Sequence, residues 1–221
     1  MDALRLTKVP LGISFIFYSF TLHIFIFILL ILTLTIPFTN SLIGTSDVIQ
    51  ALSGIDIGFG MMGVVGMALC MTAPDAISGK TLIYFAVLAC VLALLGSSVL
   101  VIFSRDANQF ATVSKNINGF LLLLWTIGLT CFLMFLQRLG QFMQNNELTD
   151  TSTKLFKFGR KYINLFLVII VLLQLIFSVK SFIFFSFIIG LLFFALMVVL
   201  VWWVWHYLRL LFDFKNALTT D

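Results

Sequence analysis

The chain has 221 residues, of which 62% are hydrophobic and 10% are charged, with a net charge of +4 and a mean hydropathy of +1.17. A soluble domain carries about 25% charged residues, so this composition excludes a water-soluble globular protein. The basic residues lie next to apolar segments, which favours anionic lipid headgroups over nucleic acid as their partner. We therefore expect an integral membrane protein that contacts the lipid bilayer and binds no nucleic acid.

Six apolar segments follow one another along the chain. Because a bilayer core of about 30 Å needs roughly 20 apolar residues in a helix, each segment predicts a membrane-spanning helix. The segments are residues 11–37, 52–71, 81–103, 117–137, 162–180 and 182–212. The loops between them are short, so residues 1–221 form a single transmembrane domain. The predicted fold class is all-α, an integral membrane six-helix bundle.

The basic residues predict the orientation of this bundle. If the N-terminus is cytoplasmic, the inner side carries ten Lys and Arg residues and the outer side carries three. The inner set is Arg5, Lys8, Lys80, Arg138, Lys154, Lys157, Arg160, Lys161, Arg209 and Lys215, and the outer set is Arg105, Lys115 and Lys180. This positive-inside bias predicts that both termini are inside.

The first apolar segment contains His23, which lies about 18 Å from the inner end of the segment at 1.5 Å per residue. Ionisable groups at this depth usually face the interior of a bundle. Thr126 and Gln174 have the same predicted depth, so the three residues form a candidate polar layer if their helices are neighbours. The favoured interpretation is hydrogen bonding that holds the helices together, at about 0.6 kcal/mol per contact. The alternative is a path for protons or a solute.

The second apolar segment is rich in glycine, and Gly54 and Gly58 have the GxxxG spacing that lets helices approach closely in lipid. A tightly packed central helix is the favoured interpretation, and a kinked helix lining a cavity is the alternative. Asp56 lies between these glycines. It is a candidate ion or proton site if it enters the hydrocarbon, and an ordinary wet carboxylate if the segment begins beside it.

The connection at residues 145–162 is the only substantial one on the inner side. Asn146 is the predicted cap of a helix that begins there. Lys154, Lys157 and Lys161 recur at three- and four-residue spacing, which predicts an amphipathic helix at the headgroup level. The last segment ends in three tryptophans and a tyrosine just before Arg209, an aromatic belt beside a positive anchor. We expect these three lysines and Arg209 to contact lipid headgroups.

No catalytic, cofactor-binding or metal-binding residue is predicted. The sequence has no GxSxG, HExxH, Walker A or GxGxxG motif. The two histidines, His23 and His206, lie at different predicted depths, so they are poorly placed to hold one haem iron between them. We therefore expect no cofactor and no enzymatic activity.

Three stretches of sequence carry a resemblance to other proteins. They are ALCMTAPDAISGKTLI at 68–83, FLMFLQRLGQFMQNNEL at 132–148 and HYLRLLFDFKNAL at 206–218. In these stretches the chain resembles a set of uncharacterised bacterial polytopic membrane proteins with six apolar segments. The resemblance covers about a fifth of the chain and implies the same topology in a bacterial inner membrane, with no assigned activity. It also implies that Cys70, Ala73 and Pro74 form one structural corner.

Two main hypotheses of function follow from the sequence. The first is an integral membrane scaffold or accessory subunit that packs with itself or with a membrane protein partner. Its support is the short loops, the 26 phenylalanines and the lack of a site motif. The alternative is a small transporter or channel that uses the Asp56 region or the His23 layer, and a haem or quinone protein is a minor third option.

Overall fold

The computed structural model describes residues 8–35, 45–103, 107–177 and 183–219; within these ranges it leaves out the side chains of 27, 30–35, 45–50, 103, 107–119, 122, 162–197 and 200. The described chain contains six helices and no strand, which confirms the all-α prediction. The helices are α1 Lys8–Thr35, α2 Thr45–Cys70, α3 Lys80–Phe103, α4 Ala107–Phe142, α5 Asn146–Phe177 and α6 Ile183–Thr219.

Four of these helices contain a stretch that is long and apolar enough to cross a membrane. The stretches are Lys8–Ile26, Ala51–Cys70, Lys80–Ile102 and Leu123–Phe142. The other two predicted spans fall mostly on 162–197, where the side chains are outside the described residues. Helix α5 begins at Asn146, as expected for the amphipathic helix predicted at 145–162, and continues into the predicted segment at 162.

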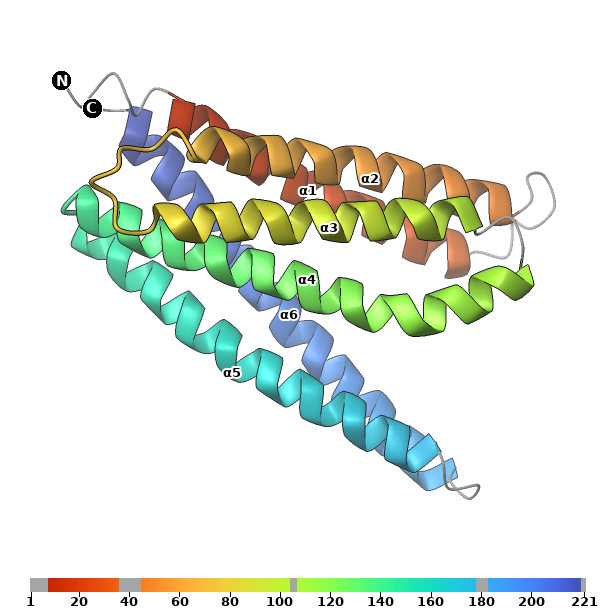
Figure 1. Cartoon of the computed structure of the whole chain (residues 1–221). Coiled ribbons are helices and arrows are strands. Elements are labelled where there is room, and N and C mark those ends of the chain that lie inside the picture. The colour runs from red at the N-terminus through yellow and green to blue at the C-terminus, as the bar shows by residue number, and fades with distance from the viewer. Residues whose placement is uncertain (1–7, 36–44, 104–106, 178–182, 220–221) are drawn as a thin grey trace.

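The helices run up and down, and each packs against the next along the chain, while α6 also returns to pack against α1 (Figure 1). One end of the molecule carries the start of α1, the end of α6, and the turns at 71–79 and 143–145. We call it the basal end. Away from it, α5 and α6 diverge from the other four helices (Figure 1).

Tight packing is concentrated at the basal end. The largest fully buried side chains there come from α1, α3, α4 and α6 and the turn before α3. They are Tyr207, Phe132, Phe135, Phe214, Ile13, Ile16, Ile77, Ile83, Leu136, Leu139, Leu210 and Leu211. They form one continuous cluster, so this end fixes how the helices are placed relative to one another.

Helices α1 and α2 touch through their backbones at Gly12 and Gly66. A Cβ on Gly12 would lie 2.5 Å from the Gly66 carbonyl oxygen, and a Cβ on Gly66 would lie 2.6 Å from the Gly12 carbonyl oxygen. Only glycine permits this approach. The predicted GxxxG pair, Gly54 and Gly58, has nothing within 4 Å of either Cβ position. Helix α2 is one unbroken helix, and its closest approach to α1 is made by Gly66 rather than by the predicted pair.

Two short turns complete the basal end. Cys70, Ala73 and Pro74 are buried in the first, where the Ala73 N–H donates to the Cys70 carbonyl oxygen at 3.1 Å. In the second, Gln144 adopts a φ of 56° and ends α4. Asn145 then caps α5, because its Oδ1 accepts the Leu148 N–H at 3.1 Å. The cap is therefore one residue earlier than the predicted Asn146.

Candidate functional site

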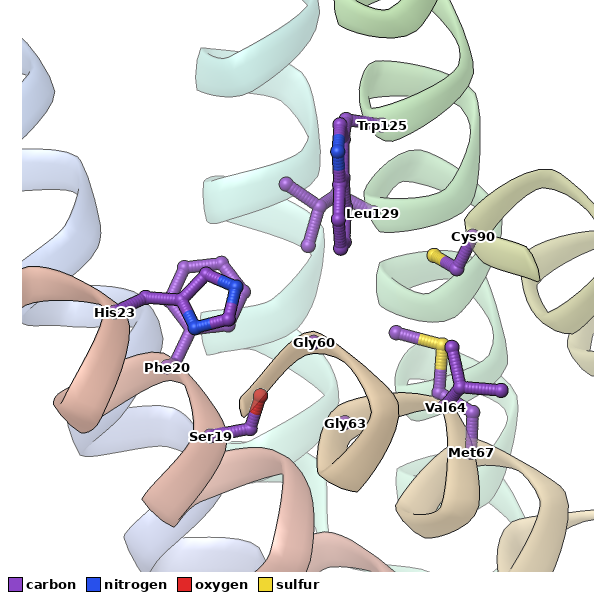
Figure 2. A pocket seen from close by; sticks show the side chains of 10 residues that line it. All are labelled: Ser19, Phe20, His23, Gly60, Gly63, Val64, Met67, Cys90, Trp125 and Leu129. Carbon is purple, nitrogen blue, oxygen red and sulfur yellow. The ribbon is translucent and has the colours of Figure 1, made fainter. Parts of the chain in front are cut away.

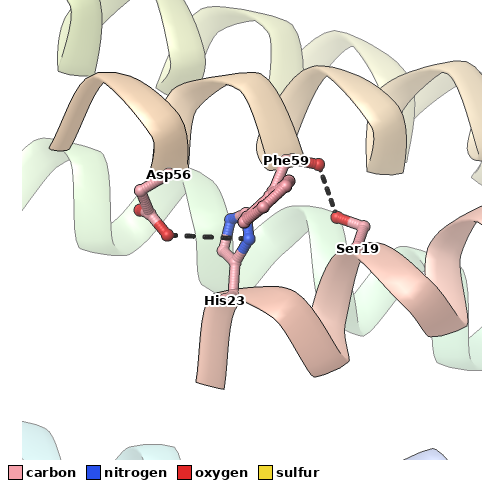
Figure 3. Close-up of polar contacts among 4 residues, drawn as sticks. All are labelled: Ser19, His23, Asp56 and Phe59. Atoms are coloured by element: carbon pink, nitrogen blue, oxygen red, sulfur yellow. Dashed lines mark hydrogen bonds and ion pairs between the residues drawn. The ribbon is translucent and has the colours of Figure 1, made fainter. Parts of the chain in front are cut away.

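The structure brings His23 and Asp56 together, although the sequence treats them as two separate candidates. His23 Nδ1 on α1 lies 3.7 Å from Asp56 Oδ1 on α2 (Figure 3). Measured from the contact of Gly12 with Gly66, His23 is 11 residues further along α1 and Asp56 is 10 residues back along α2. Because the two helices are antiparallel, both side chains reach the same level.

Asp56 is set well inside its helix. Helix α2 begins at Thr45, eleven residues before Asp56, and both sequence interpretations of this carboxylate stay predictions. Asp56 also lies within the apolar stretch Ala51–Cys70. Its side chain is 42% exposed on the described surface, and that of His23 is 28% exposed. The pair is thus half-buried between two apolar helices.

Ser19 and Phe59 fix the two helices beside this pair. The buried Ser19 hydroxyl donates to the Phe59 carbonyl oxygen at 2.6 Å (Figure 3). The Phe59 ring lies 6.5 Å from the imidazole of His23. Ser19 is one turn before His23 on the same face of α1, so the hydrogen bond and the ion pair act on the same helix contact.

His23 and Asp56 are close enough for the charge of one to affect the protonation of the other. At 3.7 Å the two groups attract without a direct hydrogen bond, since N–H···O bonds are at most about 3.2 Å long. A carboxylate with an imidazolium is neutral overall, and so is a carboxylic acid with an imidazole. Uptake or release of one proton therefore changes the net charge of the pair, and the two groups titrate as a unit. A net charge at an apolar helix contact is unfavourable, so the two neutral forms of the pair are favoured over its singly charged forms.

A cavity of about 290 Å³ adjoins His23 and lies among α1, α2, α3 and α4 (Figure 2). Its walls are mostly apolar and include Phe20, Val64, Met67, Trp125 and Leu129. Such walls do not compensate the dehydration of an ion or a sugar. The cavity therefore suits a small, mostly apolar molecule whose one polar group meets the imidazole.

The α4 residue that meets His23 is Trp125, whose ring lies 6.2 Å from the imidazole in an edge-on arrangement. Thr126 is half-buried and is turned about 100° away around the helix. Gln174 belongs to α5, but its side chain is outside the described residues, so the three-residue polar layer stays a prediction. Sequence depth located the right turn of α4 but not the side of the helix that faces inward.

The other predicted site residues lie at the surface of the basal half. Lys154, Lys157, Lys161 and Arg209 are exposed, and the ring of His206 lies 4.0 Å from that of Trp202 in a tilted arrangement. Among the described residues, no three His, Cys, Asp or Glu side chains gather to hold a metal ion. No protein family, curated protein or solved structure matches this chain.

Proposed function

We propose that this chain is a six-span protein of a bacterial inner membrane that carries a small, mostly apolar solute, with His23 and Asp56 as its proton-responsive site. The observation that supports this most directly is the contact of the pair at the edge of the cavity. This proposal takes the transporter alternative of the sequence and joins its two candidate sites into one.

The proposed coupling acts through the contact of α1 with α2. When Asp56 is ionised and His23 is protonated, the two charges attract and hold the helices together beside the cavity. Protonation of Asp56, or loss of the proton from His23, removes that attraction. The helix contact then loosens at the level of the cavity, where the nearby Ser19–Phe59 hydrogen bond still joins the two helices. Solute entry and proton uptake are thereby linked.

Binding of radiolabelled phenol to the purified protein, followed by equilibrium dialysis between about pH 5 and 8, tests this proposal. Phenol is small, mostly apolar and has one hydroxyl. We expect saturable binding that changes with pH in the natural protein and loses its pH dependence in Asp56→Asn and His23→Gln. Val64→Trp, which fills the cavity and keeps the pair, should abolish binding.

His206→Gln is the matched control, because it removes the other histidine, away from the cavity. It should leave phenol binding unchanged. In sealed vesicles, a proton flux driven by phenol should be lost in Asp56→Asn and kept in His206→Gln. Binding that is independent of pH in the natural protein, or equal in all variants, would contradict the proposal.

The orientation, with both termini in the cytoplasm, is part of the same proposal. It is supported by the gathering of described basic residues in the basal half of the molecule. Single cysteines at Ser114 and Asn146, in a protein without its three natural cysteines, should label oppositely with an impermeant thiol reagent. Labelling of Asn146→Cys from outside intact cells would reverse the assignment.

A scaffold or accessory subunit is the second candidate function, and the open face of α2 favours it. Gly54 and Gly58 are exposed with free space above them, and such a pair is typical of close helix contacts in membranes. Gly54→Leu and Gly58→Leu should abolish crosslinking to a second copy or to a co-purifying protein. Ala68→Leu, on the same exposed side nearer the basal end, should not.

A further inference from the structure

The basal half of α5 concentrates positive charge at one level. Lys154, Lys157, Arg160 and Lys161 are all exposed, and no acidic residue occurs between 154 and 161. The buried residues Leu148, Ser152 and Leu155 face the bundle instead. The bases therefore lie on the outer side of the helix. No charged residue follows Lys161 until Lys180, so the bases stand where a long apolar stretch begins.

Helix α6 places aromatic side chains at the same level. Trp203 Nε1 donates to the Leu155 carbonyl oxygen at 3.4 Å, which fixes the register of the two helices. The rings of Phe158 and Trp202 then lie 4.9 Å apart. Trp202 is 47% exposed. Indole rings in this position are typical of the boundary between lipid headgroups and acyl chains.

His206 extends the aromatic row toward the basal end. Its ring lies 4.0 Å from Trp202, and its Nδ1 lies 2.8 Å from the Trp202 carbonyl oxygen. A carbonyl oxygen only accepts, so Nδ1 carries the hydrogen and Nε2 is left for an outside partner. Lys154 is one turn before Phe158, and His206 is one turn after Trp202. Because the helices are antiparallel, Lys154 and His206 lie at one level.

From this juxtaposition we propose that the basal halves of α5 and α6 form a binding site for an anionic phospholipid. The lysines of α5 would hold the phosphodiester, and His206 Nε2 would accept a hydrogen bond from a hydroxyl group of the headgroup. Trp202 would cover the glycerol region, and the acyl chains would lie along the apolar stretch that follows Lys161. Anionic headgroups match the charge of this level, since each nearby Lys or Arg contributes about 1 kcal/mol to such binding. The inference does not depend on the His23–Asp56 pair.

Native mass spectrometry of the protein from mixed vesicles of phosphatidylglycerol and phosphatidylcholine tests the site. The natural protein should retain phosphatidylglycerol preferentially. The triple variant K154Q/K157Q/K161Q should lose that preference by about tenfold or more. The matched control K8Q/K80Q/R138Q removes three basic side chains of α1, α3 and α4 in the basal half and should stay within about twofold of the natural protein.

Further variants distinguish a specific lipid site from nonspecific attraction between the basic surface and anionic lipid. Trp202→Leu with His206→Gln should lower retention of phosphatidylglycerol while the net charge of the lysines stays the same. An equal loss in both triple variants would mean nonspecific surface charge and would overturn the proposal. Displacement by inorganic phosphate alone would assign the site to a free anion instead. Should the triple variant fail to elute as a folded protein, Lys157→Gln alone must still reduce the preference, and no reduction would also overturn it.

Discussion

The basal end of the molecule and the middle of helices α1–α4 differ in how closely their apolar side chains pack. At the basal end, Phe132, Phe135, Tyr207 and Phe214 are fully buried in one cluster. In the middle, α1, α2, α3 and α4 enclose a cavity of about 290 Å³ beside His23. Close packing at the basal end holds the helices together, so the middle can contain a cavity with a histidine at its edge. A bundle that was packed to the same density throughout would have no such cavity.

The largest expected effect is the loss of a basal aromatic side chain. Phe132→Ala should lower the free energy of unfolding by roughly 3 kcal/mol, because Phe132 is 0% exposed and its ring stacks on Phe135 at 6.0 Å. Denaturant unfolding in detergent micelles measures it. Phe85→Ala, at a position that is 56% exposed, is the control and should change little. Equal losses would show that the basal cluster does not dominate stability.

The second prediction compares two glycines of α2. Gly66→Val should destabilise by about 1–3 kcal/mol, because the added carbons meet the Gly12 backbone and force α1 away. Gly58→Val has open space at its Cβ position and should be nearly neutral in the isolated protein. The same unfolding measurement serves both variants. A larger loss for Gly58→Val would place the close helix contact in the middle and remove the contrast between the two regions.

The number and positions of the helices followed from the sequence because bilayer thickness sets the length of an apolar segment. Distance along the chain also placed Thr126, the neighbour of Trp125, at about the level of His23. It did not give the side of each helix that faces inward, so Thr126 was chosen in place of its neighbour Trp125. The partner of His23 was missed for a similar reason, because Asp56 can be placed only once the contact of Gly12 with Gly66 is known.

Loss of the Asn145 cap of α5 should have a smaller effect on the free energy of unfolding. Asn145→Ala should cost about 1 kcal/mol, because the Leu148 N–H loses its acceptor at the start of α5. Asn146→Ala is the control, since Asn146 is exposed and follows the cap, and it should be nearly neutral. Both are read from unfolding midpoints under identical conditions. A larger loss of stability in Asn146→Ala than in Asn145→Ala would show that Asn146 is the cap, as the sequence predicted.

The smallest expected effect is electrostatic and belongs to Asp213, near the end of α6. Partial burial raises the pKa of this carboxyl above its usual 3.8, the Arg209 guanidinium opposes the rise, and Glu147 adds to it. A carboxyl whose pKa is raised by folding favours the folded state while it is protonated, so the free energy of unfolding falls as pH rises through this range. Asp213→Asn lacks that fall and should be more stable than the natural protein at neutral pH, with the difference fading at pH values below 3.8. In a Glu147→Gln background the gain should be smaller, because one cause of the raised pKa is gone. If the gain in stability of Asp213→Asn stays the same at acidic pH, it comes from packing instead. The ionised Asp213 carboxylate would then not destabilise the basal end.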